Sequence, residues 1–150
     1  MRARVATGLV LWLAIAGTMA DVQAADTYVP PSIDAFLTGI RAYPFIAGAA
    51  RREKLRVGVP QVTRCMPSTE VRKLIGDPDF GYVGYKSGTN GRVPAKLIWN
   101  YVLEKKTLTG TEPGSRVVVW FDTDAKIETV TVHGAPDIET MVSRRPQTCA

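Results

Sequence analysis

Residues 65–79, CMPSTEVRKLIGDPD, predict a short helix with a clear start and stop, at the point where the chain changes from helices to strands. Pro67 suits the first helical turn, where its missing N–H is not needed, and Glu70 places negative charge near the positive end of the helix dipole. One face would be apolar, at Val71, Leu74 and Ile75. Gly76 can adopt a left-handed conformation just beyond the helix, and Pro78 prevents its continuation. A helix this short is marginal on its own, so the sequence predicts that it packs on a sheet.

Downstream of this helix, four runs of β-forming residues predict an antiparallel meander. The runs are residues 80–86, 96–106, 116–122 and 126–133. An Asn-Gly pair predicts a turn between the first two runs, and residues 122–125, DTDA, predict a hairpin between the last two. In the second run Leu97, Trp99 and Tyr101 share one face, whereas both faces of the last run are mixed. Asp137 is a candidate N-cap for a short helical turn in the tail.

Residues 25–61 form a predicted helical extension that precedes an α+β domain over residues 62–150. Ser32 is a candidate N-cap for apolar residues at helical spacing, which are Ile33, Phe36, Leu37 and Ile40. Pro44 ends or kinks this helix, and a second helical piece is expected from about residue 45 to 55. Because helices precede strands, the predicted fold class is α+β. We expect N-terminal helices packed on one face of a three- to four-stranded antiparallel sheet, in one compact unit.

Residues 1–24 have the layout of a secretory signal peptide, with two arginines, an apolar run over residues 9–16 and then small residues. Cleavage after Ala24 fits the preference for small residues, and cleavage after Ala20 is the alternative. An uncleaved anchor would need ~20 apolar residues, which is longer than this run. No cysteine lies at either cleavage site, which argues against lipid attachment. We therefore expect an exported protein, soluble in the periplasm and without a stable membrane anchor.

Cys65 and Cys149 are the two cysteines of the chain. An even pair in an oxidising compartment usually forms a disulfide bond, and this one would anchor a chain end that otherwise frays. In the chain-entropy model, closing a loop of this length stabilises the fold by roughly 4 kcal/mol. A reactive thiol and a metal-binding pair are the alternatives, although the chain has no CxxC motif.

The sequence contains no common catalytic motif, and each candidate site has a simpler interpretation. Asp122 and Asp124 have the alternate spacing of a calcium loop but lack its other ligands, and aspartates favour turns. His133 could form an acid–base pair with a nearby carboxylate, but no nucleophile motif accompanies it. A thiolate at Cys65, near a helix N-terminus, is the strongest enzymatic candidate, and it requires Cys149 to be unpaired. We therefore expect no enzymatic activity, no metal and no cofactor.

The formal net charge is +5, and the basic residues are scattered rather than clustered among aromatic residues. This distribution argues against nucleic acid as a partner. Aromatic residues in the predicted strands favour a protein partner, because aromatic side chains anchor many protein interfaces. The candidate partner-binding residues are Tyr82, Tyr85, Trp99, Tyr101 and Trp120.

Over residues 62–132 the chain resembles the SmpA/OmlA, or BamE-like, domain family. That pattern has a short helix ending in a Gly-x-Pro turn, followed by a three-stranded sheet. The matching residues are Met66, Glu70, Val71, Leu74, Gly76, Pro78, Trp99, Tyr101, Phe121 and Asp122. The chain departs from the pattern at Cys65, where the family has glycine, and at Pro67, where it has threonine.

The resemblance implies a protein-binding module in outer-membrane or cell-envelope assembly or maintenance. The best-known members of the family are lipoproteins, whereas this chain has no lipidation cysteine. The same α+β shape is also similar to the repeated unit of secreted β-lactamase inhibitor proteins. The alternative function is therefore a periplasmic inhibitor or immunity protein that binds and blocks an enzyme or toxin. In either case the partner would be another protein.

Overall fold

The computed structural model describes residues 28–89, 91–107 and 114–142. The predicted signal peptide and Cys149 lie outside these residues. The described part forms a mixed α+β fold, with an antiparallel sheet of five strands and four α-helices. In chain order the elements are α1 (Ile33–Gly39), β1 (Phe45–Ile46), α2 (Ala49–Gly58), the 3₁₀ turn η1 (Val59–Gln61), α3 (Ser68–Ile75), β2 (Phe80–Gly88), β3 (Gly91–Lys105), β4 (Ser115–Phe121), β5 (Ile127–His133) and α4 (Pro136–Val142).

The sheet is organised around β3, the longest strand in the described part of the chain. β4 pairs with one edge of β3, both β2 and β1 pair with the other, and β5 pairs with β4. The four predicted strand runs correspond to β2 to β5. Residues 45 and 46, which were predicted to begin a helix, instead pair with Lys105 and Glu104 as β1. The pairing with the end of β3 holds them extended, and this short strand makes the sheet five-stranded.

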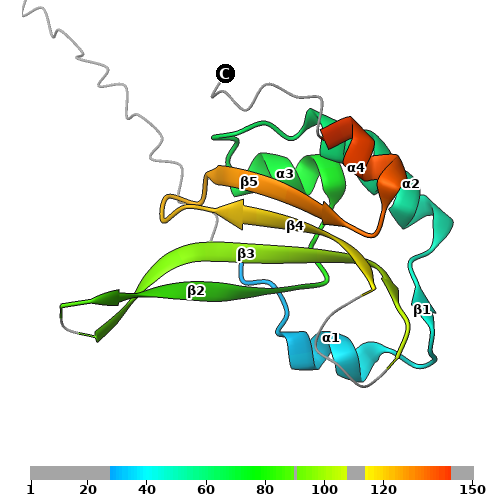
Figure 1. The fold of residues 1–150 in the computed structure, drawn as a ribbon, viewed down its shortest axis with the longest axis horizontal. Helices are drawn as coiled ribbons and strands as arrows, with labels where there is room; N and C mark the ends of the chain where they lie inside the picture. Colours follow the sequence, from blue (N-terminus) through cyan, green and yellow to red (C-terminus); the bar gives the residue numbers. More distant parts are fainter. Residues whose placement is uncertain (1–27, 90, 108–113, 143–150) are drawn as a thin grey trace, which may run out of the picture.

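Helices α2, α3 and α4 lie on the same side of the sheet (Figure 1). Their apolar side chains meet one face of β3, β4 and β5 in a single core. The core residues are Leu55, Val59, Val62, Val71, Ile75, Trp99, Tyr101, Leu103, Val117, Val119, Phe121, Ile127, Val132, Ala135 and Ile138. Because Leu55 and Val59 belong to this core, α2 and η1 pack with the residues that follow them. The buried face of β5, which the sequence left open, is the one that carries Val132.

Helix α1 packs on the opposite face of the sheet. This differs from the expectation that the N-terminal helices share one face. Its Phe36 ring lies 5.5 Å from Phe80 and 5.6 Å from Phe45, measured between ring centroids. Phe80 is the cross-strand partner of Asn100. Side chains alternate along a strand, so Phe80 lies on the face opposite to Trp99. The chain passes from α1 to α2 around the edge of the sheet by way of β1 (Figure 1).

Helix α3 has the predicted extent, and its two ends are fixed by different contacts. At the start, Pro67 is the N-cap rather than part of the first turn, and it forms a β-bridge with Lys126. The backbone N–H of Ser68 donates to the carbonyl of Ala125, which ties the helix to the β4–β5 turn. At the end, Gly76 is the C-cap, and its φ of 85° is one that glycine adopts without strain. Its ψ of −171° differs from the left-handed helical conformation that was predicted.

A partly buried carboxylate connects α2, the segment after α3 and the sheet. Asp79 Oδ2 accepts hydrogen bonds from the backbone N–H of Val102 at 2.6 Å and from Arg51 Nη2 at 3.0 Å. Arg51 Nη1 also donates to the Asp77 carbonyl, and its guanidinium lies 5.4 Å from the Tyr101 ring centroid. Burial raises the pKa of Asp79, and this effect outweighs the opposing effects of Arg51 and the Val102 N–H.

The glycine at the end of α2 allows a close approach of α3. A Cβ atom on Gly58 would lie 2.6 Å from Ile75 Cγ2 and 2.7 Å from the Leu74 carbonyl oxygen. The backbone contact leaves little room for adjustment, because a carbonyl within a packed helix cannot rotate away as a side chain can.

We expect Asp79→Asn to gain stability relative to the wild type as pH rises above 3.8, the ordinary pKa of aspartate. Because the pKa of Asp79 is raised on folding, its contribution is fully present at low pH and is lost as pH rises through its folded-state pKa. The measurement is urea unfolding of both proteins between pH 3 and 7. If the wild type instead gained stability relative to Asp79→Asn as pH rises, the contact with Arg51 would outweigh the effect of burial. Asp79→Ala, which leaves the Val102 N–H without an acceptor, should lose about 1–3 kcal/mol.

Gly58→Ala should destabilise the protein by about 1–3 kcal/mol, because a methyl group is forced into the α2–α3 contact. Gly39→Ala is the matched control, since nothing lies within 4 Å of the added atom at the end of α1. It should change the free energy of unfolding by less than about 0.5 kcal/mol. Equal effects of the two substitutions would contradict the close approach at Gly58.

Candidate functional site

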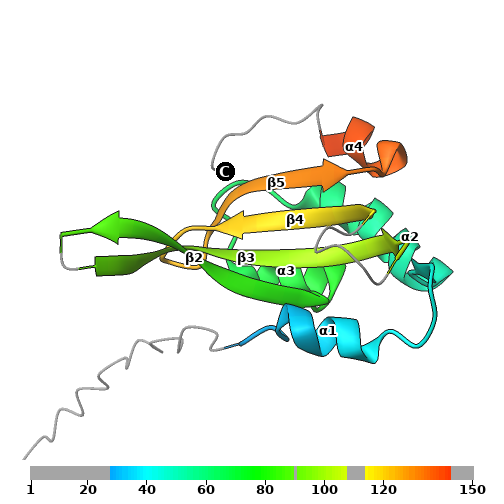
Figure 2. The ribbon, with the colours of Figure 1, turned by 60° about the horizontal axis from the view of Figure 1, so that its bottom comes forward.

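Most of the exposed large apolar side chains of the described residues lie on or beside one element. The eight such side chains are Val29, Ile46, Val57, Tyr82, Val83, Tyr85, Val93 and Met141. Five of these eight belong to the β2–β3 hairpin or to the segment beside it: Val29, Tyr82, Val83, Tyr85 and Val93. The hairpin extends beyond the body of the molecule on the side away from β1 (Figures 1 and 2). We call these five residues the hairpin patch.

The hairpin patch is exposed because the helices are shorter than the strands. An eight-residue helix such as α3 spans about 12 Å, whereas a strand of 15 residues such as β3 spans about 50 Å. The helices therefore cover the half of β3 that carries Trp99, Tyr101 and Leu103. The other half, with β2 alongside it, continues past them into solvent (Figure 2).

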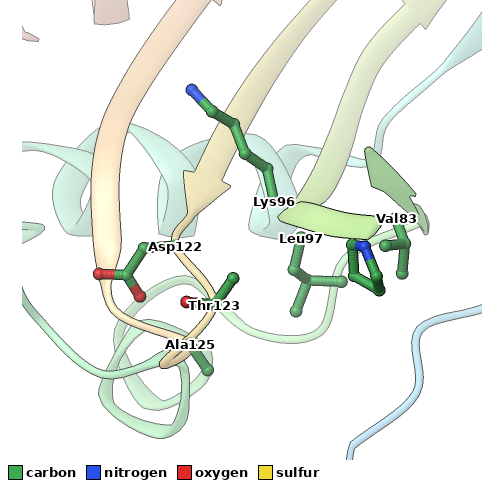
Figure 3. Close-up of a pocket in the computed structure, with 7 residues that line it drawn as sticks. Val83, Lys96, Leu97, Asp122, Thr123 and Ala125 are labelled. Carbon is green, nitrogen blue, oxygen red and sulfur yellow. The ribbon is translucent and has the colours of Figure 1, made fainter. Parts of the chain in front are cut away.

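A hollow lies between the base of the hairpin and the β4–β5 turn (Figure 3), and we call it the turn hollow. Its volume is about 290 Å³, and its lining residues are Val83, Pro94, Lys96, Leu97, Asp122, Thr123 and Ala125. Figure 3 shows the Lys96 side chain directed away from this lining. Its ammonium group instead forms an ion pair with Glu128 at 2.8 Å. The turn hollow therefore has an apolar side formed by Val83 and Leu97 and a polar side formed by the turn.

A second hollow of about 350 Å³ lies on the other side of the Val83–Leu97 pair, and we call it the edge hollow. Its lining residues are Tyr28, Val29, Pro30, Ser32, Gly81, Tyr82, Val83 and Leu97. The N-terminal segment contributes half of this lining. The edge hollow thus lies beside the outer edge of β2, where the described chain begins.

The N-terminal segment is held against the start of β2 by specific contacts. The backbone N–H of Gly81 donates to the Pro31 carbonyl at 2.9 Å. Pro30 lies so close to Gly81 that a Cβ atom there would collide with the proline ring, so glycine is required. The Tyr28 ring packs edge-on against Trp99 at 5.6 Å and lies 3.7 Å from the Arg72 guanidinium.

Of the predicted partner-binding residues, the structure places Tyr82 and Tyr85 on the hairpin, 50% and 58% exposed. Trp99 and Tyr101, which were also candidate partner-binding residues, are almost completely buried in the core. Their face of β3 is the one that the helices cover, and the Tyr101 hydroxyl donates to the Gly76 carbonyl. Trp120 is half-buried, and its Nε1 lies 3.4 Å from Thr131 Oγ1. The sequence analysis missed Val29, Val83 and Val93.

The candidate chemical groups lie apart from the hairpin patch or have structural contacts. Asp122 Oδ1 accepts from the backbone N–H groups of Asp124 and Lys126, both at 2.9 Å, so it closes the β4–β5 turn. His133 is exposed at the end of β5. Cys65 is disulfide-bonded and has a φ of 66°. Its predicted partner Cys149 lies outside the described residues, so this pairing stays a prediction.

The described ranges hold neither a metal-binding cluster nor a membrane-spanning helix. No group of three or more His, Cys, Asp or Glu side chains there could hold a metal ion. The helices that the structure describes are all too short or too polar to span a bilayer.

We expect Tyr82→Ala and Tyr85→Ala to fold normally, because both side chains are half exposed. Each should change the free energy of unfolding by no more than about 0.5 kcal/mol, as is usual for surface substitutions. Trp99→Ala should lose about 3–5 kcal/mol, since it empties the centre of the core. Urea unfolding monitored by circular dichroism measures all three. A large loss for either tyrosine would place it in the packing of the fold instead of on a free surface.

Comparison with known proteins gives no relative from which a role could be transferred. No family model matches the chain, and neither a curated protein nor a solved structure matches it. The function is therefore inferred from the geometry of the hairpin and its two hollows.

Proposed function

We propose that this protein is an exported, non-enzymatic protein-binding module of the periplasm, and that the β2–β3 hairpin is its contact surface. The observation that carries this proposal is the gathering of exposed apolar and aromatic side chains on the hairpin patch. Scattered apolar residues are normal on protein surfaces, but a group of them on one projecting element is typical of an interaction site. Tyrosines such as Tyr82 and Tyr85 are common anchors of protein interfaces.

The layered arrangement supports this function, because the helices stabilise the sheet without occupying the hairpin. One face of β3, β4 and β5 is closed by the core, and α1 contacts Phe80 at the opposite face. The distal parts of β2 and β3 are left for a partner. The hairpin has a firm base, since Val83 and Leu97 pair directly across the two strands.

We also propose a role in cell-envelope assembly or maintenance, on the basis of the resemblance to the SmpA/OmlA, or BamE-like, family. The order of a short helix followed by antiparallel strands fits that pattern. Cys65 has a positive φ, a conformation that favours glycine, and the family has glycine at this position. The predicted Cys65–Cys149 disulfide would then fix the strained segment before α3 and anchor the C-terminal end of the chain.

The proposal is tested by capturing partners on the exported protein from the periplasm and the detergent-solubilised envelope of its own cells. The double variant Tyr82→Ala/Tyr85→Ala should capture at least tenfold less partner than the wild type, because two interface anchors are removed. The matched control is Ile46→Ala/Met141→Ala, which removes two exposed apolar side chains away from the hairpin. It should capture as much as the wild type.

Equal capture by the wild type and both variants would overturn the hairpin as the contact surface. The identity of a hairpin-dependent partner then separates the two binding roles. Components of outer-membrane assembly would support the envelope role, whereas a single soluble enzyme or toxin would support inhibition or immunity.

A further inference from the structure

The outer edge of β2 is paired at its start and open along the rest of its length. The Gly81 N–H bonds to Pro31, which shows that the backbone groups of Gly81 point away from β3. Because this direction alternates along a strand, the N–H and C=O groups of Val83 also point outward. No residue that the structure describes pairs with them. β2 therefore presents backbone donors and acceptors next to the edge hollow.

The N-terminal segment cannot extend its own pairing along this edge. Pro30 and Pro31 lack N–H groups, so they have no donor to offer to a neighbouring strand. Tyr28 then leaves the edge and packs against Trp99 and Arg72. The segment thus ends its pairing with β2 at Gly81, and the space beyond it is the edge hollow.

The charged side chains of the hairpin are all basic. Residues 80–103 contain three basic residues, Lys86, Arg92 and Lys96, and no Asp or Glu. Lys96 forms an ion pair with Glu128 at the base of the hairpin. Lys86 and Arg92 are exposed near its tip, on adjacent strands. A partner that carries Asp or Glu at this position would be attracted to the tip.

We propose that an extended acidic peptide segment of a partner protein adds to the outer edge of β2 as a further strand. This inference rests on the proposed binding function and specifies its partner. The peptide backbone bonds to the outward groups of Val83, and one apolar side chain enters the edge hollow. Acidic side chains meet Lys86 on β2, and Arg92 on the neighbouring β3 adds to the positive charge of the tip. Val83 and Lys86 are three residues apart, which is about 10 Å along a strand. The apolar and acidic positions of the peptide should therefore be about three residues apart.

The test uses a random nine-residue peptide library displayed on phage and selected on the full exported protein. Selected peptides should be rich in Asp and Glu and poor in Pro, with an apolar residue about three positions from an acidic one. Lys86→Glu/Arg92→Glu should bind a selected peptide at least tenfold more weakly. Arg64→Glu/Lys73→Glu is the matched control, since it makes the same change of charge at exposed residues away from the hairpin. It should retain binding within about twofold.

A second measurement tests the position of the peptide. Amide hydrogen exchange at Val83 should slow at least tenfold when a selected peptide is bound, because its N–H becomes hydrogen-bonded. Circular dichroism and urea unfolding establish that each variant is folded before binding is measured.

Several outcomes would overturn the inference while leaving the proposed function intact. These are the absence of selected peptides, equal binding by the charge-reversed variant, or unchanged exchange at Val83 in the complex. Binding to phosphatidylglycerol vesicles through Lys86 and Arg92, without any selected peptide, would show instead that the tip recognises a lipid surface. If Tyr82→Ala/Tyr85→Ala also captures every partner normally, the proposed function itself fails.

Discussion

The burial of one face of β3 under three helices is the constraint on which the rest of the structure depends. Trp99, Tyr101 and Leu103 follow one another on this face, and each is almost completely buried. Burying a large apolar side chain contributes about 1.5–3 kcal/mol, so these positions are a large part of the stability of a small domain. The short helices can supply that burial along only half of the strand. The other half is the projecting hairpin. The limited length of the helices therefore determines both where the core ends and where the candidate site begins.

Polar contacts set the position of α2 and α3 over this buried face. Arg51 reaches from α2 to Asp79 and Asp77, and Asp79 in turn accepts from the backbone of Val102 in β3. The Tyr101 hydroxyl donates to Gly76, the residue that ends α3. Apolar packing can be satisfied in several orientations, whereas these directional bonds fix one. They also fix the direction in which β2 leaves the body, because Asp79 immediately precedes it.

Local signals in the sequence predicted most of the elements, since each signal acts within a few residues, but they missed β1, whose pairing partners lie 58 to 60 residues away. The capping of α1 by Ser32, the end of α3 at Gly76 and the turns between strands are of this kind. The sequence did not reveal that α1 packs against Phe80, because this contact depends on how the chain passes the sheet edge. Trp99 and Tyr85 are both aromatic residues in strands, and only the length of the covering helices decides which is buried. The open edge of β2 likewise depends on where the segment of Pro30 and Pro31 lies.

Two pairings of the sheet join parts of the chain that are far apart, which has a consequence for the order in which the fold forms. Phe45 pairs with Lys105, and Pro67 with Lys126, so the sheet closes only after most of the domain has been made. The β2–β3, β3–β4 and β4–β5 pairings join consecutive strands, whereas these two pairings must close large loops and are expected to form last. Under the proposed export, late completion of the sheet would keep the chain in a form that can be threaded through a narrow channel before it folds.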